Sequence, residues 1–282
     1  MADYLSKRGA NIAPSYAAIA DLPASTEVGD LVFVGGQLGI AVDASTFNTC
    51  DKTDISTGFN WASATQQAKM QASDVAGALL GGAIAIDTDT LVVGARKLNS
   101  NTGAAYVFTR SGTSWSQQAK LTASDAAAND YLGYHSGNSI AISGDTVVAG
   151  AYGDDDGGSS SGSAYVFTRS GTSWSQQAKL TASDAAAYNE FGNATAIEGD
   201  TIVIGSHQSD NGGFYVDYTG SAYIYTRSGT SWTQVKKIQS SDIQAGDNFG
   251  KSVAIYSNTI VAGAWGEDTG ANLAGAAYAF TA

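Results

Sequence analysis

One stretch of this chain is written twice. Residues 106–128 read YVFTRSGTSWSQQAKLTASDAAA, and residues 165–187 repeat those letters without a change. Looser copies flank the pair, so a unit of roughly sixty residues accounts for most of the 282-residue chain. A repeat of this period is typical of solenoids, propellers and other arrays, and it constrains the fold more than any single residue does.

Four copies of the unit align in phase. Each copy carries a polar outer-strand sequence of the type Gln-Gln-Ala-Lys, a Ser-Asp pair, a bulky residue followed by glycine, and a short apolar run. A tight polar turn, a β-branched run ending in Gly-Ala or Gly-Ser, and an aromatic run such as Ala105–Phe108 complete the copy. Four short β-rich runs separated by Gly, Asp, Asn and Ser predict four antiparallel strands, which make one propeller blade. A helical solenoid is excluded, because it needs runs of about ten residues or more with an apolar period of 3.6.

The paired residues resemble a known family. Phe191-Gly192 and Gly150-Ala151, at their spacing before a Tyr-Val-Phe strand, are similar to the FG-GAP repeat. The resemblance covers residues 61–282 and implies an all-β fold, the β-propeller of integrin α subunits and of many bacterial and viral surface proteins. The integrin repeat carries a DxDxDG calcium loop between its first two strands. The turns here are shorter, so we expect no calcium at that place: Asp87–Asp89, Ser143–Asp145, Glu198–Asp200 and Tyr256–Asn258.

The part before the repeats has a different character. Residues 1–21 are weakly patterned and fit an extended arm or one short helix, whereas Leu31–Val34 and Leu38–Val42 predict a small β-hairpin. The stretch from Ala20 to Trp61 resembles short modules of tail and fibre proteins of bacterial viruses, and this resemblance implies a docking role. The sequence therefore predicts two domains, an N-terminal arm and β docking module over residues 1–60 and a four-repeat propeller over residues 61–282.

The repeat count suggests how the propeller closes. The chain supplies an outer strand at Gln66–Met70, then three complete four-strand units, then three strands up to Ala282. Pairing the first outer strand with the last three strands gives a closed ring of four four-stranded blades and removes exposed sheet edges. We expect this closure, although seven blades are usual in the family. The alternative is an open half-ring that another subunit completes.

Composition excludes several classes of function. The formal net charge of −12 argues against nucleic-acid binding, which needs a basic face. Cys50 is the single cysteine, so no disulfide forms within the chain. No apolar run approaches the ~20 residues of a membrane helix, and the first residues lack the layout of a signal peptide. His135 and His207 lie in different repeats, and no catalytic motif is present, so we predict no catalytic residue and no enzyme.

Antiparallel order places the loops after the second and outer strands on one face. The loops after the second strand differ between repeats while the strands do not, which favours a binding surface; loops free to drift without a function are the alternative. The carboxylates of Asp154–Asp156 are candidate Ca²⁺ ligands, with ordinary solvated charge as the alternative. An aromatic insertion at residues 214–218 either stacks on a sugar or a protein or plugs the propeller mouth. The candidate binding residues are Tyr152, Asp154, Asp155, Asp156, Phe214, Tyr215, Asp217, Tyr218 and Trp265.

These features predict a non-enzymatic structural and adhesion protein of a virion, in a tail, neck or capsid appendage. Residues 1–60 would dock to other virion structural proteins, and the propeller loops would bind a host-surface glycan or protein. We expect a homo-oligomer, as is common among such appendages, and no cofactor apart from the candidate Ca²⁺. The alternatives are a secreted or surface bacterial adhesin and a glycan-active enzyme that uses paired carboxylates.

Overall fold

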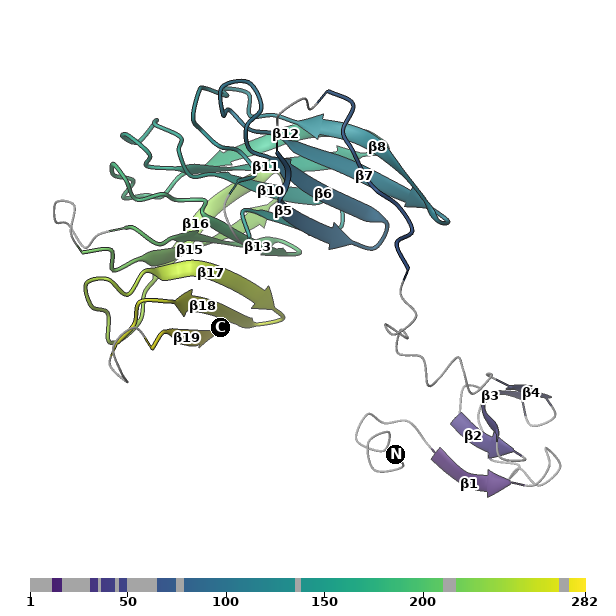
Figure 1. Cartoon of the computed structure of the whole chain (residues 1–282). Coiled ribbons are helices and arrows are strands. Elements are labelled where there is room, and N and C mark those ends of the chain that lie inside the picture. The colour runs from purple at the N-terminus through teal and green to yellow at the C-terminus, as the bar shows by residue number, and fades with distance from the viewer. Residues whose placement is uncertain are drawn as a thin grey trace. The chain divides into compact units, whose positions relative to one another are not determined.

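The computed structural model describes residues 12–16, 31–34, 37–43, 46–49, 65–74, 79–134, 138–209, 217–268 and 274–282. The chain divides into two compact units, Met1–Gln66 and Gln67–Ala282 (Figure 1). The sequence places this boundary at residue 60. The described residues contain strands and loops, and none of them forms a helix that could span a membrane. Cys50 and residues 58–61 lie outside the described residues.

The N-terminal unit contains one four-stranded sheet in the order β1-β2-β3-β4. Strand β1 (Ile12–Tyr16) pairs in parallel with β2 (Leu31–Val34). Strands β2 and β3 (Gln37–Asp43) are antiparallel, with Val34 opposite Gln37, and β4 (Thr46–Thr49) pairs with β3. The predicted hairpin is confirmed. Of the extended arm and the short helix expected for residues 1–21, the described part, β1, is extended.

The second unit contains four sheets, one for each repeat. Within each sheet the strands follow chain order and pair antiparallel, so the all-β, four-blade prediction is confirmed. The first blade comprises β5 (Leu80–Asp87), β6 (Thr90–Ala95), β7 (Ala105–Ser111) and β8 (Ser114–Leu121). The second comprises β9 (Ile140–Ser143), β10 (Thr146–Ala151), β11 (Ser163–Ser170) and β12 (Ser173–Leu180). The third comprises β13 (Ala194–Glu198), β14 (Thr201–Ser206), β15 (Ser221–Ser228) and β16 (Ser231–Ile238), and the fourth comprises β17 (Phe249–Tyr256), β18 (Thr259–Ala264) and β19 (Ala276–Thr281).

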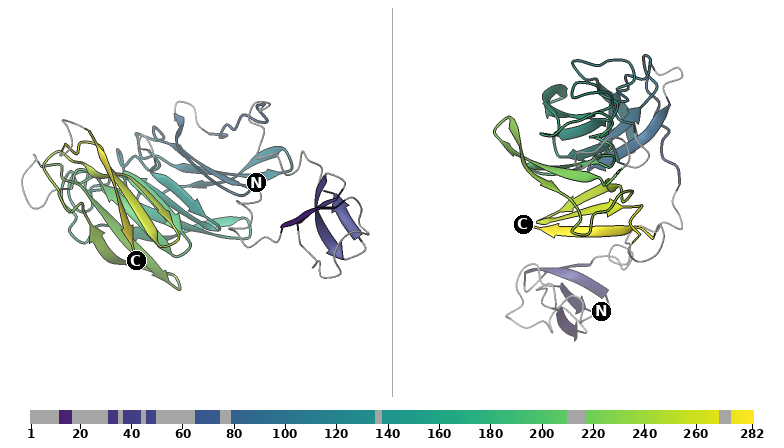
Figure 2. Two further views of the ribbon diagram at one scale, coloured as in Figure 1. Left: turned by 90° about the horizontal axis from the view of Figure 1, so that it is seen from below. Right: turned by 90° about the vertical axis from the view of Figure 1, so that its left-hand side faces the viewer.

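The predicted closure of the ring by an N-terminal outer strand is wrong. The fourth sheet has three strands, and the described residues 65–72 belong to no strand. The inner strands contact one another in succession, β5 with β9, β9 with β13 and β13 with β17, and the sheets follow one another from the blue first blade to the yellow fourth (Figure 2). Met70 and Ala72 pack against the first blade beside Leu91 and Tyr106.

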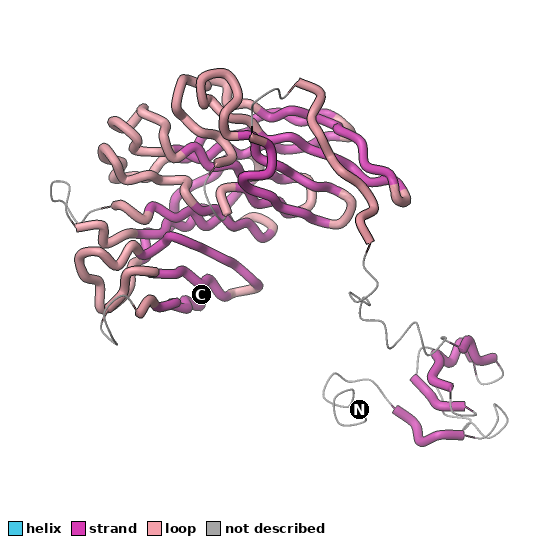
Figure 3. The backbone as a smooth tube through the Cα atoms, in the orientation of Figure 1, coloured by secondary structure: helices cyan, strands magenta, loops and turns pink. Residues whose placement is uncertain are grey.

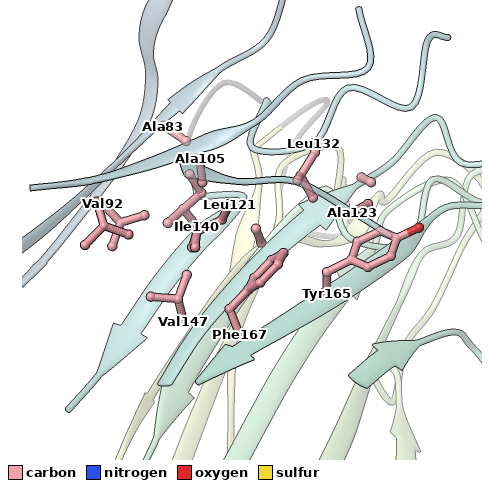
Figure 4. Close-up of a cluster of buried hydrophobic side chains, with 13 residues drawn as sticks. Ala83, Val92, Ala105, Leu121, Ala123, Leu132, Ile140, Val147, Tyr165 and Phe167 are labelled. Atoms are coloured by element: carbon pink, nitrogen blue, oxygen red, sulfur yellow. The ribbon is translucent and has the colours of Figure 1, made fainter. Parts of the chain in front are cut away.

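The core lies between successive blades. One buried cluster joins Val92 and Val107 of the first blade to Ile140, Val147 and Phe167 of the second (Figure 4). Strand β10 is buried at every position because the first and third blades cover its two faces. Strand β6 is equally buried, with the second blade on one face and Met70 and Ala72 packed against the other. A strand buried on both faces reads as a continuous apolar run, which explains why the second strand of each repeat shows no alternation.

The glycine pairs of the repeat have a packing role. A Cβ atom on Gly94, Gly150 or Gly205 would overlap the carbonyl oxygen of a glycine in the next blade, namely Gly133, Gly192 or Gly250 respectively. These partner glycines have positive φ, +71° at Gly133, a conformation that side chains disfavour. The Gly-Ala pair of one blade and the bulky-residue–glycine pair of the next therefore form one close backbone contact.

Candidate binding surface

The loops after the second and outer strands share one end of the blades, which we call the loop end. Backbone hydrogen bonds join them: the amide of Tyr131 donates to the carbonyl of Asn101 (2.9 Å), and the amide of Glu190 donates to that of Ser160 (3.1 Å). Figure 3 shows the long loops gathered at this end. The arrangement of the loops predicted from strand order is therefore present.

The opposite end, which we call the turn end, is uniform. The guanidinium Nε of Arg110 donates to Asp89 at 2.7 Å, and the same bond recurs in the next two blades. Each of these arginines also lies over a tryptophan ring of its own blade, 5.1–5.6 Å from the ring centroid. The turn carboxylates thus have arginine partners at the place where the integrin repeat holds calcium.

The residue directly after each Gly-Ala or Gly-Ser pair lies at the loop end, and we call these four the post-glycine residues. The scaffold around them repeats, but their chemistry does not: they are Arg96, Tyr152, His207 and Trp265. The guanidinium carbon of Arg96 lies 4.3 Å from the centroid of the Tyr134 ring. Tyr152 stacks on Tyr131, with ring centroids 5.2 Å apart. A cation and three tyrosines therefore meet where the first blade joins the second.

The other two post-glycine residues differ in exposure. His207 is buried, with its Nε2 atom 2.9 Å from Lys251 Nζ and 3.6 Å from Glu190 Oε2. Burial raises the pKa of Glu190 and lowers the pKa of Lys251. Trp265 is 64% exposed. The loop end thus presents a tyrosine–arginine cluster, a buried polar cluster and an exposed indole on successive blades.

The acidic loop of the second blade is built around a buried carboxylate. Asp154 accepts hydrogen bonds from Ser163 Oγ (2.9 Å), Tyr165 OH (2.8 Å) and Lys179 Nζ (2.9 Å). Lys179 also donates to Asp125 (2.7 Å) and Asp156 (2.6 Å). Burial lowers the pKa of Lys179, but the bonds to the three carboxylates outweigh it and leave the pKa raised.

The predicted calcium ligands are only partly brought together. Oxygens of Asp125, Asp154 and Asp156 lie within 4.8 Å of one another, a set that could hold a cation. Asp155 lies outside that set and accepts a hydrogen bond from the amide of Ser160 (3.0 Å). Because the Lys179 ammonium lies among the three carboxylates, a Ca²⁺ ion would have to displace it. Calcium binding here stays a prediction.

The aromatic insertion is described only at its end. Phe214 and Tyr215 lie outside the described residues. The carbonyl of Asp217 accepts a bond from the Gly246 amide (2.6 Å), and the carbonyl of Tyr218 accepts one from the Asn248 amide (2.8 Å). These bonds place Asp217 and Tyr218 at the loop end, and Tyr218 is partly exposed.

Sequence reasoning missed three members of the loop-end surface, Arg96, Tyr131 and Tyr134. A signal was present. Tyr131 and Tyr134 flank the Leu132-Gly133 pair, and the third repeat has Glu190 and Asn193 at these positions. Every repeat contains the bulky-residue–glycine pair, but the residues on either side of it differ between repeats. These flanking positions belong to the same surface as the variable loops.

Comparison with known families identifies the repeat. The model described as FG-GAP repeat matches residues 64–108, 115–167, 174–225 and 232–280. Each match begins at or before an outer-strand sequence and ends in the third strand of the next blade. No curated protein matches the chain.

Proposed function

The chain belongs to the FG-GAP repeat family, and from that premise we propose that it is a non-enzymatic binding and adhesion protein whose loop end recognises the partner. The observation that carries this proposal is the asymmetry of the two ends. The turn end repeats the same arginine–carboxylate contact in three blades, while the post-glycine residues change from blade to blade. A rigid scaffold with one divergent end is the usual form of a recognition surface.

The chemistry of the loop end favours a glycan or a polar protein surface. Stacked Tyr131 and Tyr152 and exposed Trp265 offer aromatic faces, which bind apolar faces of sugars and protein side chains. Arg96 beside Tyr134 adds hydrogen-bond donors.

A binding screen tests the proposal. The labelled full chain is applied to arrays of glycans and of surface proteins, and each hit is measured with the wild type and with Tyr152→Ala and Trp265→Ala. Both substitutions remove exposed or partly exposed aromatic area at the loop end. We expect at least one to weaken binding by tenfold or more, as loss of a central aromatic contact does.

The matched control is Val235→Ala, which removes an exposed apolar side chain from the outer strand of the third blade. This variant should bind like the wild type. Wild-type binding by both loop-end variants would place recognition elsewhere and contradict the proposal, as would an equal loss of binding in all three variants. Shortening of a bound glycan, detected by mass spectrometry, would contradict its non-enzymatic part.

The finer part of the proposal places this protein in a virus particle, anchored by residues 1–60 and carrying the propeller as an appendage. It is supported by the resemblance of the N-terminal stretch to tail and fibre modules and by the separate sheet of that unit. Mass spectrometry and electron microscopy of purified particles test it, and we expect the chain in stoichiometric amounts. Its absence from particles, with presence on a bacterial surface, would favour the adhesin instead.

A further inference from the structure

The junctions between blades repeat the same contacts. Between the first and second blades, Arg169 Nη1 donates to Thr90 Oγ1 (3.1 Å) and Trp174 Nε1 donates to Gln118 Oε1 (2.8 Å). The second and third blades make both bonds at the same distances. These two interfaces therefore have the same design, in which an arginine and a tryptophan of one blade donate hydrogen bonds to the preceding blade.

The first blade lacks the neighbour that this design requires. Ile84 on β5 is 64% exposed, although its equivalents in the other three blades are almost fully buried. Ile86 is equally exposed, at 63%. Gly81 is the glycine equivalent to Gly133, and a Cβ atom added to it would have no described atom within 4 Å. The equivalents of Ile84 are Ile140 at 1%, Thr195 at 0% and Val253 at 3%.

The fourth blade lacks the complementary neighbour. Val261 on β18 is 37% exposed, whereas its equivalents in the first three blades are completely buried. A Cβ atom added to Gly263 would contact only Ser252 of its own blade. In the other three blades the equivalent Cβ would overlap a glycine carbonyl of the following blade. Thr259 occupies the place of Thr90, but no arginine reaches it within the described residues. The equivalents of Val261 are Val92, Val148 and Val203, each at 0%.

Arg110 is the donor that would complete this pair of faces. It bonds to Asp89, as the equivalent arginines bond in their own blades, but the described contacts include none from Arg110 to a threonine of an earlier blade. Its side chain is 39% exposed, against 20% for Arg169 and 21% for Arg227. The donor Arg110 thus lies in the first blade and the acceptor Thr259 lies in the fourth, at opposite ends of the row of blades.

The outer strand missing from the fourth sheet has a counterpart at the first blade. The amide of Ser73 donates to Gln117 Oε1 (3.2 Å), as the amide of Ser124 donates to Gln176 in the next blade (2.9 Å). Asp74 accepts bonds from Tyr106 and Lys120. The first blade therefore holds residues 70–74 as it would hold the end of a preceding blade's outer strand, while β19 has no outer partner among the described strands.

We propose that a second copy of this chain packs its fourth sheet against the first sheet of the other, head to tail. In this interface Val261 covers Ile84, Arg110 bonds to Thr259, and β19 pairs with residues 67–70 of the partner. A second copy repeats the existing junction, whereas closure within one chain would rearrange three junctions that share the same glycine contact. Two copies joined at both ends give eight blades, within the usual range of four to eight. This inference does not rest on the proposed function.

Light scattering coupled to size-exclusion chromatography tests the proposal with the full chain over a concentration series. We expect the mass of the wild type to be twice that of one chain. Ile84→Asp and Val261→Asp each place a charge on one end face at an exposed position, and each should reduce the mass to one chain. The control Val235→Asp changes an exposed valine of β16 and should leave the mass doubled.

Mixing the two variants distinguishes this head-to-tail interface from other modes of association. Ile84→Asp keeps an intact fourth-blade face, and Val261→Asp keeps an intact first-blade face, so an equimolar mixture should form a one-to-one complex through one junction. A wild type that stays at one chain at every concentration would overturn the proposal, as would variants that remain dimeric or a mixture that does not combine.

A measurement on the wild type alone avoids any effect of the substitutions on folding. Hydrogen exchange at the amides of β19 and of residues 67–70 should slow at least tenfold as the protein concentration rises, because both edges gain a paired strand. Exchange at these amides that is independent of concentration would overturn the predicted pairing.

Discussion

Single glycines set how closely the blades approach. Gly150 leaves room for the carbonyl of Gly192, and a Cβ at that place would overlap backbone atoms that cannot rotate away. Gly263 occupies the equivalent place in the fourth blade, but there a Cβ would meet the Oγ of Ser252, which can rotate. The same residue at the same point of the repeat should therefore differ in its tolerance of substitution.

We predict that Gly150→Ala lowers the free energy of unfolding by about 3 kcal/mol, the upper part of the range for overpacking a tight contact. Urea unfolding at low protein concentration, followed by tryptophan fluorescence, measures the loss. Gly263→Ala is the matched control and should cost less than about 1 kcal/mol. Equal costs would mean that the close contact with the next blade is not what requires glycine.

The recurrent aspartate of each Ser-Asp pair links two blades. Asp184 accepts bonds from Tyr223 (2.9 Å) and Lys237 (2.8 Å) in the third blade. Burial raises its pKa, but the bonds from Lys237 and Tyr223 outweigh burial and leave the pKa below the ordinary value of 3.8. A carboxyl group whose pKa is lower in the folded state stabilises the fold above pH 3.8, and this stabilisation is lost as the pH falls.

We predict that Asp184→Asn costs up to about 1 kcal/mol at pH 7, a value limited by the partial exposure of the pair. The gap between the wild type and the variant should shrink as the pH falls below 3.8. Urea unfolding between pH 3 and pH 7 measures it. A gap that stays constant over this interval would show that the ion pair contributes nothing.

At the scale of elements, the loop of the second blade depends on the carboxylate that it wraps. Asp154 binds Ser163, Tyr165 and Lys179, and its carbonyl accepts the amide of Gly162 (2.9 Å). The loop over residues 153–161 is therefore ordered by a side chain that sequence analysis assigned to metal binding or to solvated charge.

We predict that Asp154→Ala increases hydrogen exchange in residues 153–161 by tenfold or more and costs about 2 kcal/mol, because the buried hydroxyl groups of Ser163 and Tyr165 lose this acceptor. Lys179 keeps its bonds to Asp125 and Asp156. Asp156→Asn is the control, since Asp156 is largely exposed and contacts only Lys179 among these donors. This variant should change exchange by less than threefold. Comparable exchange in both variants would mean that Asp154 does not order the loop.

Most strands could be predicted from sequence, and one segment shows why the rest could not. Gln117–Leu121 and Gln66–Met70 have nearly the same letters, yet the first lies in β8 and the second in no strand. A strand forms only where a neighbouring backbone offers hydrogen bonds, and repeat letters do not say which neighbour is present. The four-blade order was predictable because each pairing lies within one repeat; the closure was not.

The candidate site was predictable to the same extent. Strand order placed the variable loops together at one end, because antiparallel strands alternate direction. Partners within those loops depend on side-chain reach: Lys179 comes from an outer strand, and nothing in its local sequence points to Asp154. The stacking of Tyr131 on Tyr152 likewise joins two loops of one blade, at a distance that letters do not give.

For the whole molecule, the two compact units should fold separately. The propeller unit has its own buried clusters, all formed by residues 70–280. We predict that a fragment of residues 67–282 keeps its β-sheet circular dichroism and unfolds within about 5 °C of the full chain. Calorimetry measures the transition. A fragment that lacks a cooperative transition would show that the propeller needs the N-terminal unit.

The equality of the junctions has an evolutionary consequence. A gene that gains or loses one full repeat would still encode only contacts that have already been selected, since each new boundary copies an old one. Such a lineage can vary its number of blades by recombination between identical segments such as residues 106–128 and 165–187, without inventing a single new surface.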